Sequence, residues 1–110
     1  DCCADEKWRV LLLNGQQYLD YRVSTCGRII SLCGKRVRLL TPYVDAAGYR
    51  LFLPVGYNKL VRVHRAVAET FIKGKTRCRR FVNHKNGDGS ENHVQNLEWV
   101  TRREDGAHRA

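Results

Sequence analysis

The chain has 110 residues, the size of one ordinary domain, and its 43% apolar content excludes a disordered composition. Lysine and arginine together number 20 against 11 acidic residues, and the formal net charge is +9. Fourteen of the basic residues are arginine, whose planar fork of donors fits phosphate oxygens in pairs. We therefore expect nucleic acid as a partner, rather than a merely basic surface.

Membrane insertion and a disulfide framework are both poorly supported. The longest apolar runs, such as Val10–Leu13, have about four residues, far fewer than a membrane span needs. The acidic start DCCADEKW is unlike a secretory signal. The five cysteines are irregularly spaced and form no CxxC pair. We expect reduced thiols in a cytosolic protein, with a mixed metal site of Cys26, Cys33 and a histidine as the alternative.

The first half of the chain is typical of short antiparallel strands. The segments that we predict as strands are Tyr18–Val23, Arg28–Leu32, Arg36–Leu40, Tyr49–Leu53 and Leu60–Val63. Gly34 marks a turn between the second and third of them, and Thr41-Pro42 breaks the pattern after the third. Residues 8 to 63 thus predict one small antiparallel sheet, with basic residues between the apolar ones.

The segment VHRAVAETFI, which follows, changes period from strand to helix. Val63, Val67 and Phe71 recur at helical spacing and form one apolar face. We expect this helix to cover the sheet and to end near Gly74, since glycine favours the C-terminal end of a helix.

Residues 73 to 80, KGKTRCRR, contain five basic side chains in eight positions. Such a cluster is either a solvated loop or a set of phosphate contacts. Its place just ahead of His84 favours phosphate contacts.

The C-terminal part predicts the order strand, loop, strand, helix. Phe81-Val82 and Leu97–Val100 flank a loop rich in turn formers. Thr101, with Glu104 three residues later, is a capping box that indicates a helix start. His84 ends the first strand, Asn96 starts the second and Asp105 follows in the helix. If the strands pair and the helix folds back, these side chains converge in one pocket open to solvent.

Three motifs here resemble the HNH nuclease motif of the ββα-metal fold. They are V-N-H at Val82–His84, N-G-D at Asn86–Asp88 and N-L-E-W-V-T at Asn96–Thr101. Upstream, YRVSTCGRIISL and VHRAVAETFI resemble the module that precedes HNH in phage-type homing endonucleases. The resemblance covers about residues 8 to 105, nearly the whole chain.

The resemblance implies an α+β fold and a metal-dependent endonuclease. We expect a small N-terminal antiparallel sheet with a covering helix as a DNA-binding module over residues 1–72. A C-terminal ββα-metal (HNH) motif follows over residues 73–110, and we expect the two parts to form one compact unit. The implied reaction is hydrolysis of phosphodiester bonds in duplex DNA, by nicking or double-strand cutting, in the host cell cytoplasm if the chain is phage-encoded.

The resemblance also assigns roles to four residues. His84 matches the general base that activates water, and Asn96 matches the residue that holds its imidazole. Asn83 and Asp105 match the ligands of one divalent metal ion per site, Mg²⁺, with Mn²⁺ as the alternative. In close relatives the first ligand is Asp and the last is Asn, so the order is reversed here.

Physical chemistry supports these roles independently. An imidazole can accept a proton from water near neutral pH, and a divalent cation offsets the charge that develops on the attacked phosphate. Mg²⁺ takes one or two carboxylates and completes its shell with water and phosphate oxygens. An amide orients a histidine without favouring its charged form, as a carboxylate would. Each residue also has a structural alternative, such as a strand-end polar group for His84 or a helix N-terminal charge for Asp105.

The remaining predictions concern partners. We expect double-stranded DNA, bound by a monomer or homodimer, and no membrane. Candidate contacts on the sheet are Arg22, Arg28, Arg36, Arg38, Arg50 and Arg62, and those near the candidate site are Lys73, Lys75, Arg77, Arg79, Arg80 and Lys85. Two alternatives stay open: a non-catalytic nucleic-acid-binding module with a nuclease-like fold, and an RNA-binding or ribosome-associated basic domain.

Overall fold

The computed structural model of the chain describes residues 6–34, 36–57, 59–89 and 91–103. Along this part of the sequence seven strands precede the helix α1, and a short 3₁₀ helix separates the two strands that follow it. The elements are β1 (Trp8–Leu13), β2 (Gln16–Ser24), β3 (Ile29–Ser31), β4 (Arg38–Leu39), β5 (Tyr43–Val44), β6 (Arg50–Phe52), β7 (Val61–Arg62), α1 (Val63–Phe71), β8 (Arg79–His84), η2 (Val94–Asn96) and β9 (Leu97–Thr101). The predicted α+β class is confirmed.

The first sheet has four antiparallel strands in the order β1-β2-β3-β4. β1 and β2 form a hairpin around Asn14 and Gly15, whose φ angles of 51° and 80° are the left-handed values that a tight hairpin turn requires. Strand β1 was not among the segments predicted one by one. Its run WRVLLL lacks a strict alternation of polar and apolar residues. In the structure this strand shifts register between Val10 and Leu11.

The prediction of one continuous sheet was wrong. β5, β6 and β7 form a second, three-stranded antiparallel sheet. The break falls at Thr41-Pro42, between the end of β4 and the start of β5, where proline has no N–H to donate to a strand partner. The break is therefore larger than the sequence reading allowed, since it separates two sheets rather than two strands of one.

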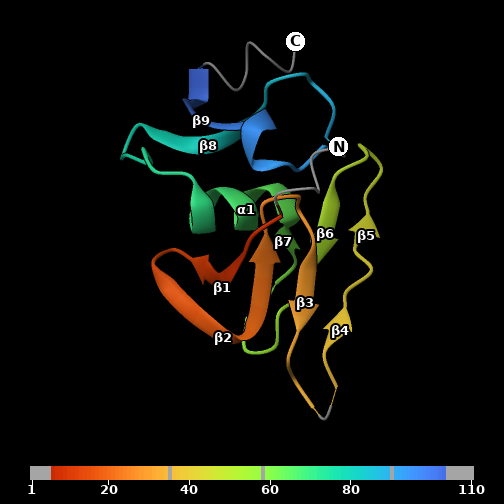
Figure 1. Cartoon of the computed structure of the whole chain (residues 1–110). Coiled ribbons are helices and arrows are strands. Elements are labelled where there is room, and N and C mark those ends of the chain that lie inside the picture. The colour runs from red at the N-terminus through yellow and green to blue at the C-terminus, as the bar shows by residue number, and fades with distance from the viewer. Residues whose placement is uncertain (1–5, 35, 58, 90, 104–110) are drawn as a thin grey trace.

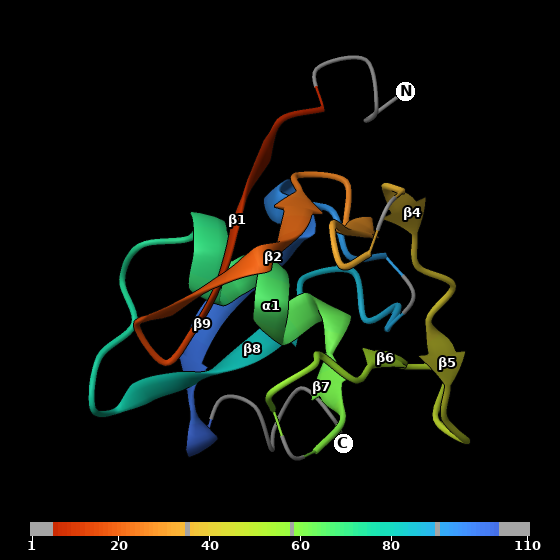
Figure 2. The ribbon, with the colours of Figure 1, turned by 90° about the horizontal axis from the view of Figure 1, so that it is seen from below.

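Helix α1 lies between the β1–β2 hairpin and the β8–β9 hairpin (Figure 1), and Figure 2 shows the same order from below. Val63, Ala66 and Val67 are fully buried on its inner face and join Leu11 and Val23 of the first sheet in the core. The predicted covering helix is thus confirmed, although it ends at Phe71, slightly before the expected Gly74. At nine residues it is too short to cross a membrane, and no other described helix is long enough.

The C-terminal strands β8 and β9 pair antiparallel, with Val82 opposite Trp99 and His84 opposite Leu97. The Trp99 indole donates to the Ile72 carbonyl at 2.9 Å and ties this hairpin to the end of α1. Residues 102 and 103 are helical, as expected after Thr101. Glu104, which would complete the predicted capping box, lies outside the described residues. The division at residue 72 stays a prediction.

Candidate active site

His84 ends β8, and its ring is held by hydrogen bonding and packing. The side chain is 5% exposed, and its Nε2 lies 2.9 Å from Oδ1 of Asn92, in the loop between the two strands. A carbonyl oxygen can only accept a hydrogen bond, so Nε2 carries the proton. The other ring nitrogen, Nδ1, is then the one with a free lone pair.

Asn92 is placed by the N-terminal sheet. Gly27, in the turn between β2 and β3, has φ +84°, and a Cβ at this position would lie 2.7 Å from Cβ of Asn92 and 2.9 Å from its carbonyl oxygen. The backbone N–H of Val94 donates to the carbonyl of Thr25, in the same turn, at 2.8 Å. Only glycine permits this close approach, so the turn fixes the residue that bonds to His84.

Two further rings pack around His84. His64, in the first turn of α1, is 6% exposed, and its ring is edge-on to that of His84 with centroids 4.6 Å apart. The Tyr49 ring lies 5.7 Å from His84 and 5.4 Å from His64. A Cβ at Gly89 would lie 3.0 Å from the Tyr49 ring, so the loop after His84 also packs on this tyrosine. The imidazole therefore has little rotational freedom.

Asn96 lies close to His84 along the backbone, as the pairing of the strands predicted. The N–H of Lys85 donates to the Asn96 carbonyl at 2.7 Å. Its side chain, however, accepts from the Asn86 N–H at 3.1 Å and donates to the Glu91 carbonyl at 2.8 Å. The Asn96 amide thus closes the loop, and its role in holding the imidazole stays a prediction. The hydrogen bond to the imidazole comes from Asn92.

Asn83 pairs with Glu98 across the hairpin. Its Nδ2 donates to Oε2 of Glu98 at 2.8 Å, which turns the amide oxygen, a suitable ligand for a hard cation, away from that bond. The residue is 8% exposed. The other predicted ligand, Asp105, lies outside the described residues. The residue that can be placed therefore fits an oxygen-coordinated metal ion by the chemistry of its amide oxygen.

The expected crowding of side chains in one open pocket is not met by the residues that can be placed. Asn83 and His84 are neighbours on a strand, where successive side chains point to opposite faces. Both are buried. Asn83 bonds within the hairpin, whereas His84 faces Asn92 and the rings from the N-terminal half. The sequence argument overlooked this strand alternation.

The alternative metal site of Cys26, Cys33 and a histidine gains no support. Within the described ranges, no group of three or more His, Cys, Asp or Glu residues could hold a metal ion. Cys33 and Cys78 are free thiols.

The candidate DNA contacts fall into two kinds of environment. Several arginines of the sheets are engaged locally: Arg22 donates to the carbonyls of Leu19 and Tyr21, and Arg28 forms an ion pair with Glu6. Within this ion pair, the hydrogen bond that Arg28 donates holds the pKa of the Glu6 carboxyl below its usual value. Others are exposed on strands, turns or the segment before the hairpin, namely Arg36, Arg38, Arg62, Lys73, Lys75, Arg77, Arg79, Arg80 and Lys85, while Arg50 on β6 is half-buried.

Sequence reasoning missed four residues that shape the site. Glu98 was quoted within the NLEWVT motif but given no role, and Asn92 was passed over in the loop. His64 was read as structural, and Tyr49 only as a strand residue. A buried histidine and a half-buried tyrosine leave no signal in one sequence that they share a neighbour, because their meeting depends on how α1 packs on the hairpin. The one available signal was that a second amide side chain, Asn92, follows His84 by eight residues in the same loop.

The chain resembles known proteins by sequence and by structure. Two uncharacterised HNH endonucleases of Acanthamoeba polyphaga mimivirus are 48% identical over 48 residues and 33% identical over 92 residues. These matches cover 43% and 81% of this chain but only 12% and 27% of the relatives, so the chain spans a minor part of their length. No family model matches the sequence.

A solved structure of the HNH homing endonuclease I-HmuI, a protein that binds and cleaves DNA, matches 94% of this chain and 57% of its own. The TM-score is 0.72 and the identity is 29%. The agreement therefore extends over the N-terminal sheets, α1 and the hairpin alike. By the names of its curated relatives and by its fold, this chain is a relative of the HNH endonucleases.

Proposed function

We propose that the chain is the catalytic region of a metal-dependent endonuclease that hydrolyses phosphodiester bonds in duplex DNA. The observation that carries the proposal is the bond between Nε2 of His84 and Asn92, at the HNH position of an HNH-like fold. It leaves Nδ1 of the neutral imidazole as the acceptor, which is what a general base requires. The +9 charge suits a polyanionic substrate.

The proposed role of His84 is to take a proton from the attacking water at Nδ1. Asn92 fixes the tautomer, while His64 and Tyr49 limit the rotation of the ring. Asn92 is neutral, so it orients the imidazole without favouring the charged form, which could not accept a proton. Asn96 keeps the loop closed so that Asn92 stays in place.

The proposed metal ligands are the amide oxygen of Asn83 and the carboxylate of Asp105. When bound, a divalent cation such as Mg²⁺ would offset charge on the phosphate and stabilise the leaving oxygen. Glu98 keeps the Asn83 amide in the orientation that presents its oxygen. One carboxylate and one amide suit Mg²⁺, which completes its shell with water and phosphate oxygens.

Plasmid nicking tests the proposal. Supercoiled plasmid is incubated with the protein and Mg²⁺, and the relaxed and linear products are quantified. We expect His84→Ala to lower the nicking rate by about 10²–10⁴-fold, the usual contribution of a general base. His93→Gln is the control, since this histidine lies in the same loop but its ring accepts from the N–H of Gln95. Equal nicking by wild type and His84→Ala would remove the assigned base.

The second candidate is a module that binds nucleic acid without cutting it. It is favoured by the 5% exposure of His84, since water must reach a general base, and by the reversed order of the two metal ligands. This module would bind duplex DNA in a salt-sensitive way and yield no metal-dependent product. It also predicts that Asp105→Ala changes nothing. Nicking by wild type that requires both Mg²⁺ and His84 would exclude it.

A further inference from the structure

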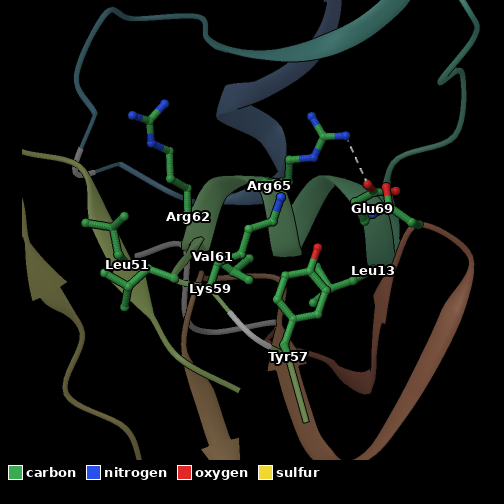
Figure 3. Close-up of a pocket in the computed structure, with 10 residues that line it drawn as sticks. Leu13, Leu51, Tyr57, Lys59, Val61, Arg62, Arg65 and Glu69 are labelled. Atoms are coloured by element: carbon green, nitrogen blue, oxygen red, sulfur yellow. Dashed lines mark ion pairs between the residues drawn. The ribbon is translucent and has the colours of Figure 1, made fainter. Parts of the chain in front are cut away.

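Beside helix α1 runs a basic depression that the active-site assignment does not use. It consists of two adjoining pockets of about 470 and 500 Å³, which share Asn14 and Arg65. Figure 3 shows the first pocket, with Arg62 at the end of β7 and Arg65 on α1, both on the side of the β8–β9 hairpin. The cations that line the pair are Lys59, Arg62, Arg65, Lys75, Arg77 and Arg80, against the single carboxylate of Glu69. We refer to this pair as the α1 groove.

Two of these cations are held in place by the protein itself. The Glu69 side chain is 6% exposed and lies between Arg65, at 3.3 Å, and Lys75, at 2.9 Å. Arg65 also donates to the Arg80 carbonyl at 2.8 Å, and both cations lie over the Trp99 ring, at 5.5 and 5.6 Å. Cations fixed in this way lose little conformational freedom when an anion binds, and Arg65 keeps further N–H groups to donate.

One end of the α1 groove reaches the candidate base. The Arg62 guanidinium lies 5.0 Å from the centre of the Tyr49 ring, and that ring lies 5.7 Å from His84. The groove therefore begins one side chain from the imidazole and continues past Arg65 to Lys75, Arg77 and Arg80. A strand bound along it would carry its phosphates past the site where cutting is proposed.

We propose that the α1 groove is the track for the phosphate backbone of one DNA strand next to the cut. The proposal rests on the proposed function in naming DNA, but it moves the main contact from the face of the first sheet to the side of α1. It adds Lys59 and Arg65 to the candidate contacts. The row of cations matches a row of phosphates by charge, and it is continuous with the candidate site. Phosphate contacts of this kind would set affinity and register rather than sequence preference.

The test compares pairs of exposed cations by the salt dependence of binding to a short duplex of random sequence, in EDTA so that nothing is cut. The groove variant is Arg62→Gln with Arg77→Gln, one from each pocket. Each lost phosphate contact should reduce the slope of log K against log salt by about 0.9, so we expect a reduction of about 1.8 and a roughly 10- to 100-fold weaker affinity near 0.1 M salt. Lys7→Gln with Arg9→Gln, exposed cations of the N-terminal strand region, is the control of equal charge and should leave the slope nearly unchanged.

A third variant, Arg36→Gln with Arg38→Gln, represents the competing sheet surface. The proposal is overturned if this variant, and not the groove variant, flattens the slope, if all three variants act equally, or if the wild type does not bind the duplex. Plasmid nicking with Mg²⁺ separates this outcome from the proposed function. If the wild type binds through the groove but never nicks, the proposed endonuclease function is wrong and the groove proposal stands. If the wild type nicks while the groove variant binds DNA normally, the groove proposal is wrong and the endonuclease function stands.

Discussion

The two faces of the β8–β9 hairpin differ in how their key side chains are held. On one face, Asn83 is oriented by Glu98, its partner within the same hairpin. On the other, the His84 ring is held by Asn92, whose position depends on the turn at Gly27. The rings of His64, in α1, and of Tyr49, just before β6, pack against it. The candidate metal ligand is thus set locally, whereas the candidate base is set by the N-terminal half of the chain.

This difference gives the N-terminal sheets a second role besides carrying positive charge. A change in the turn between β2 and β3 should disturb the base and leave Asn83 in place. A change within the hairpin should disturb both the base and Asn83. The following substitutions test how far the base depends on the N-terminal half, in decreasing order of expected effect.

Gly27→Ala should give the largest effect. The new Cβ would lie 2.7 Å from Cβ of Asn92, and alanine would also be strained at φ +84°. We expect a loss of about 2–4 kcal/mol in the free energy of unfolding, measured by denaturant titration, because strain and overlap add. Nicking by the protein that remains folded should also fall, since Asn92 must shift.

Gly15→Ala is the matched control. Gly15 has nearly the same φ, +80°, but nothing lies within 4 Å of the position a Cβ would take. It should lose only the backbone cost of roughly 1–2 kcal/mol. Equal destabilisation by the two variants would mean that the close approach of Gly27 to Asn92 has no energetic weight.

Asn92→Ala should have a smaller effect, concentrated in catalysis. It removes the acceptor of the Nε2 proton, so the imidazole loses its fixed tautomer and orientation. We expect the maximal nicking rate to fall by about 10- to 100-fold, as for other residues that orient a reactive histidine, with little change in DNA affinity. Rates are measured at saturating protein over plasmid.

Asn92→Asp distinguishes orientation from electrostatics. The carboxylate still accepts the hydrogen bond, but it favours the charged imidazole, which cannot act as a base. We expect a nicking rate that is low at neutral pH and recovers as the pH rises. If the alanine variant nicks as fast as the wild type, Asn92 does not position the base.

The local sequence signals predicted much of this molecule. The strands that alternate polar and apolar residues, the helical spacing of Val63, Val67 and Phe71, and the hairpin around His84 were all recognised. The strands Trp8–Leu13 and Tyr43–Val44 were missed as separate elements, although Asn14-Gly15 after the first is a strong hairpin signal. The likeness to HNH endonucleases was also readable, since its motifs lie close together along the chain.

The contacts of the candidate site were harder to predict, because they join distant segments. Asn92 and Asn96 lie in one loop and are chemically identical. Which of them reaches the imidazole depends on the closing of the loop by Asn86 and Glu91. It also depends on the turn of Gly27, some sixty residues earlier. The resemblance assigned the orienting role to Asn96, whereas the hydrogen bond to the imidazole comes from Asn92.

The smallest expected effect concerns the far side of the same turn. Arg28, directly after Gly27, forms an ion pair with Glu6, and the Arg28 hydrogen bond lowers the pKa of Glu6 from its ordinary value of 4.5. A carboxyl whose pKa is lower in the folded state stabilises the fold at pH values above its unfolded pKa. This stabilisation is lost as the pH falls through the folded pKa. The Arg28 side chain is 48% exposed, so solvent screening keeps the contribution small.

Glu6→Gln should therefore lower the free energy of unfolding at pH 7 by less than about 1 kcal/mol, and the difference from wild type should shrink as the pH falls below 4.5. Denaturant titrations at several pH values measure both quantities, and a double variant with Arg28→Gln isolates the pair from the packing of Arg28 over Trp8. A difference that grows on acidification would have the wrong sign for this ion pair. Nicking that drops with Glu6→Gln as it does with Gly27→Ala would show that the whole turn, and not only its closest contact with Asn92, sets the position of the base.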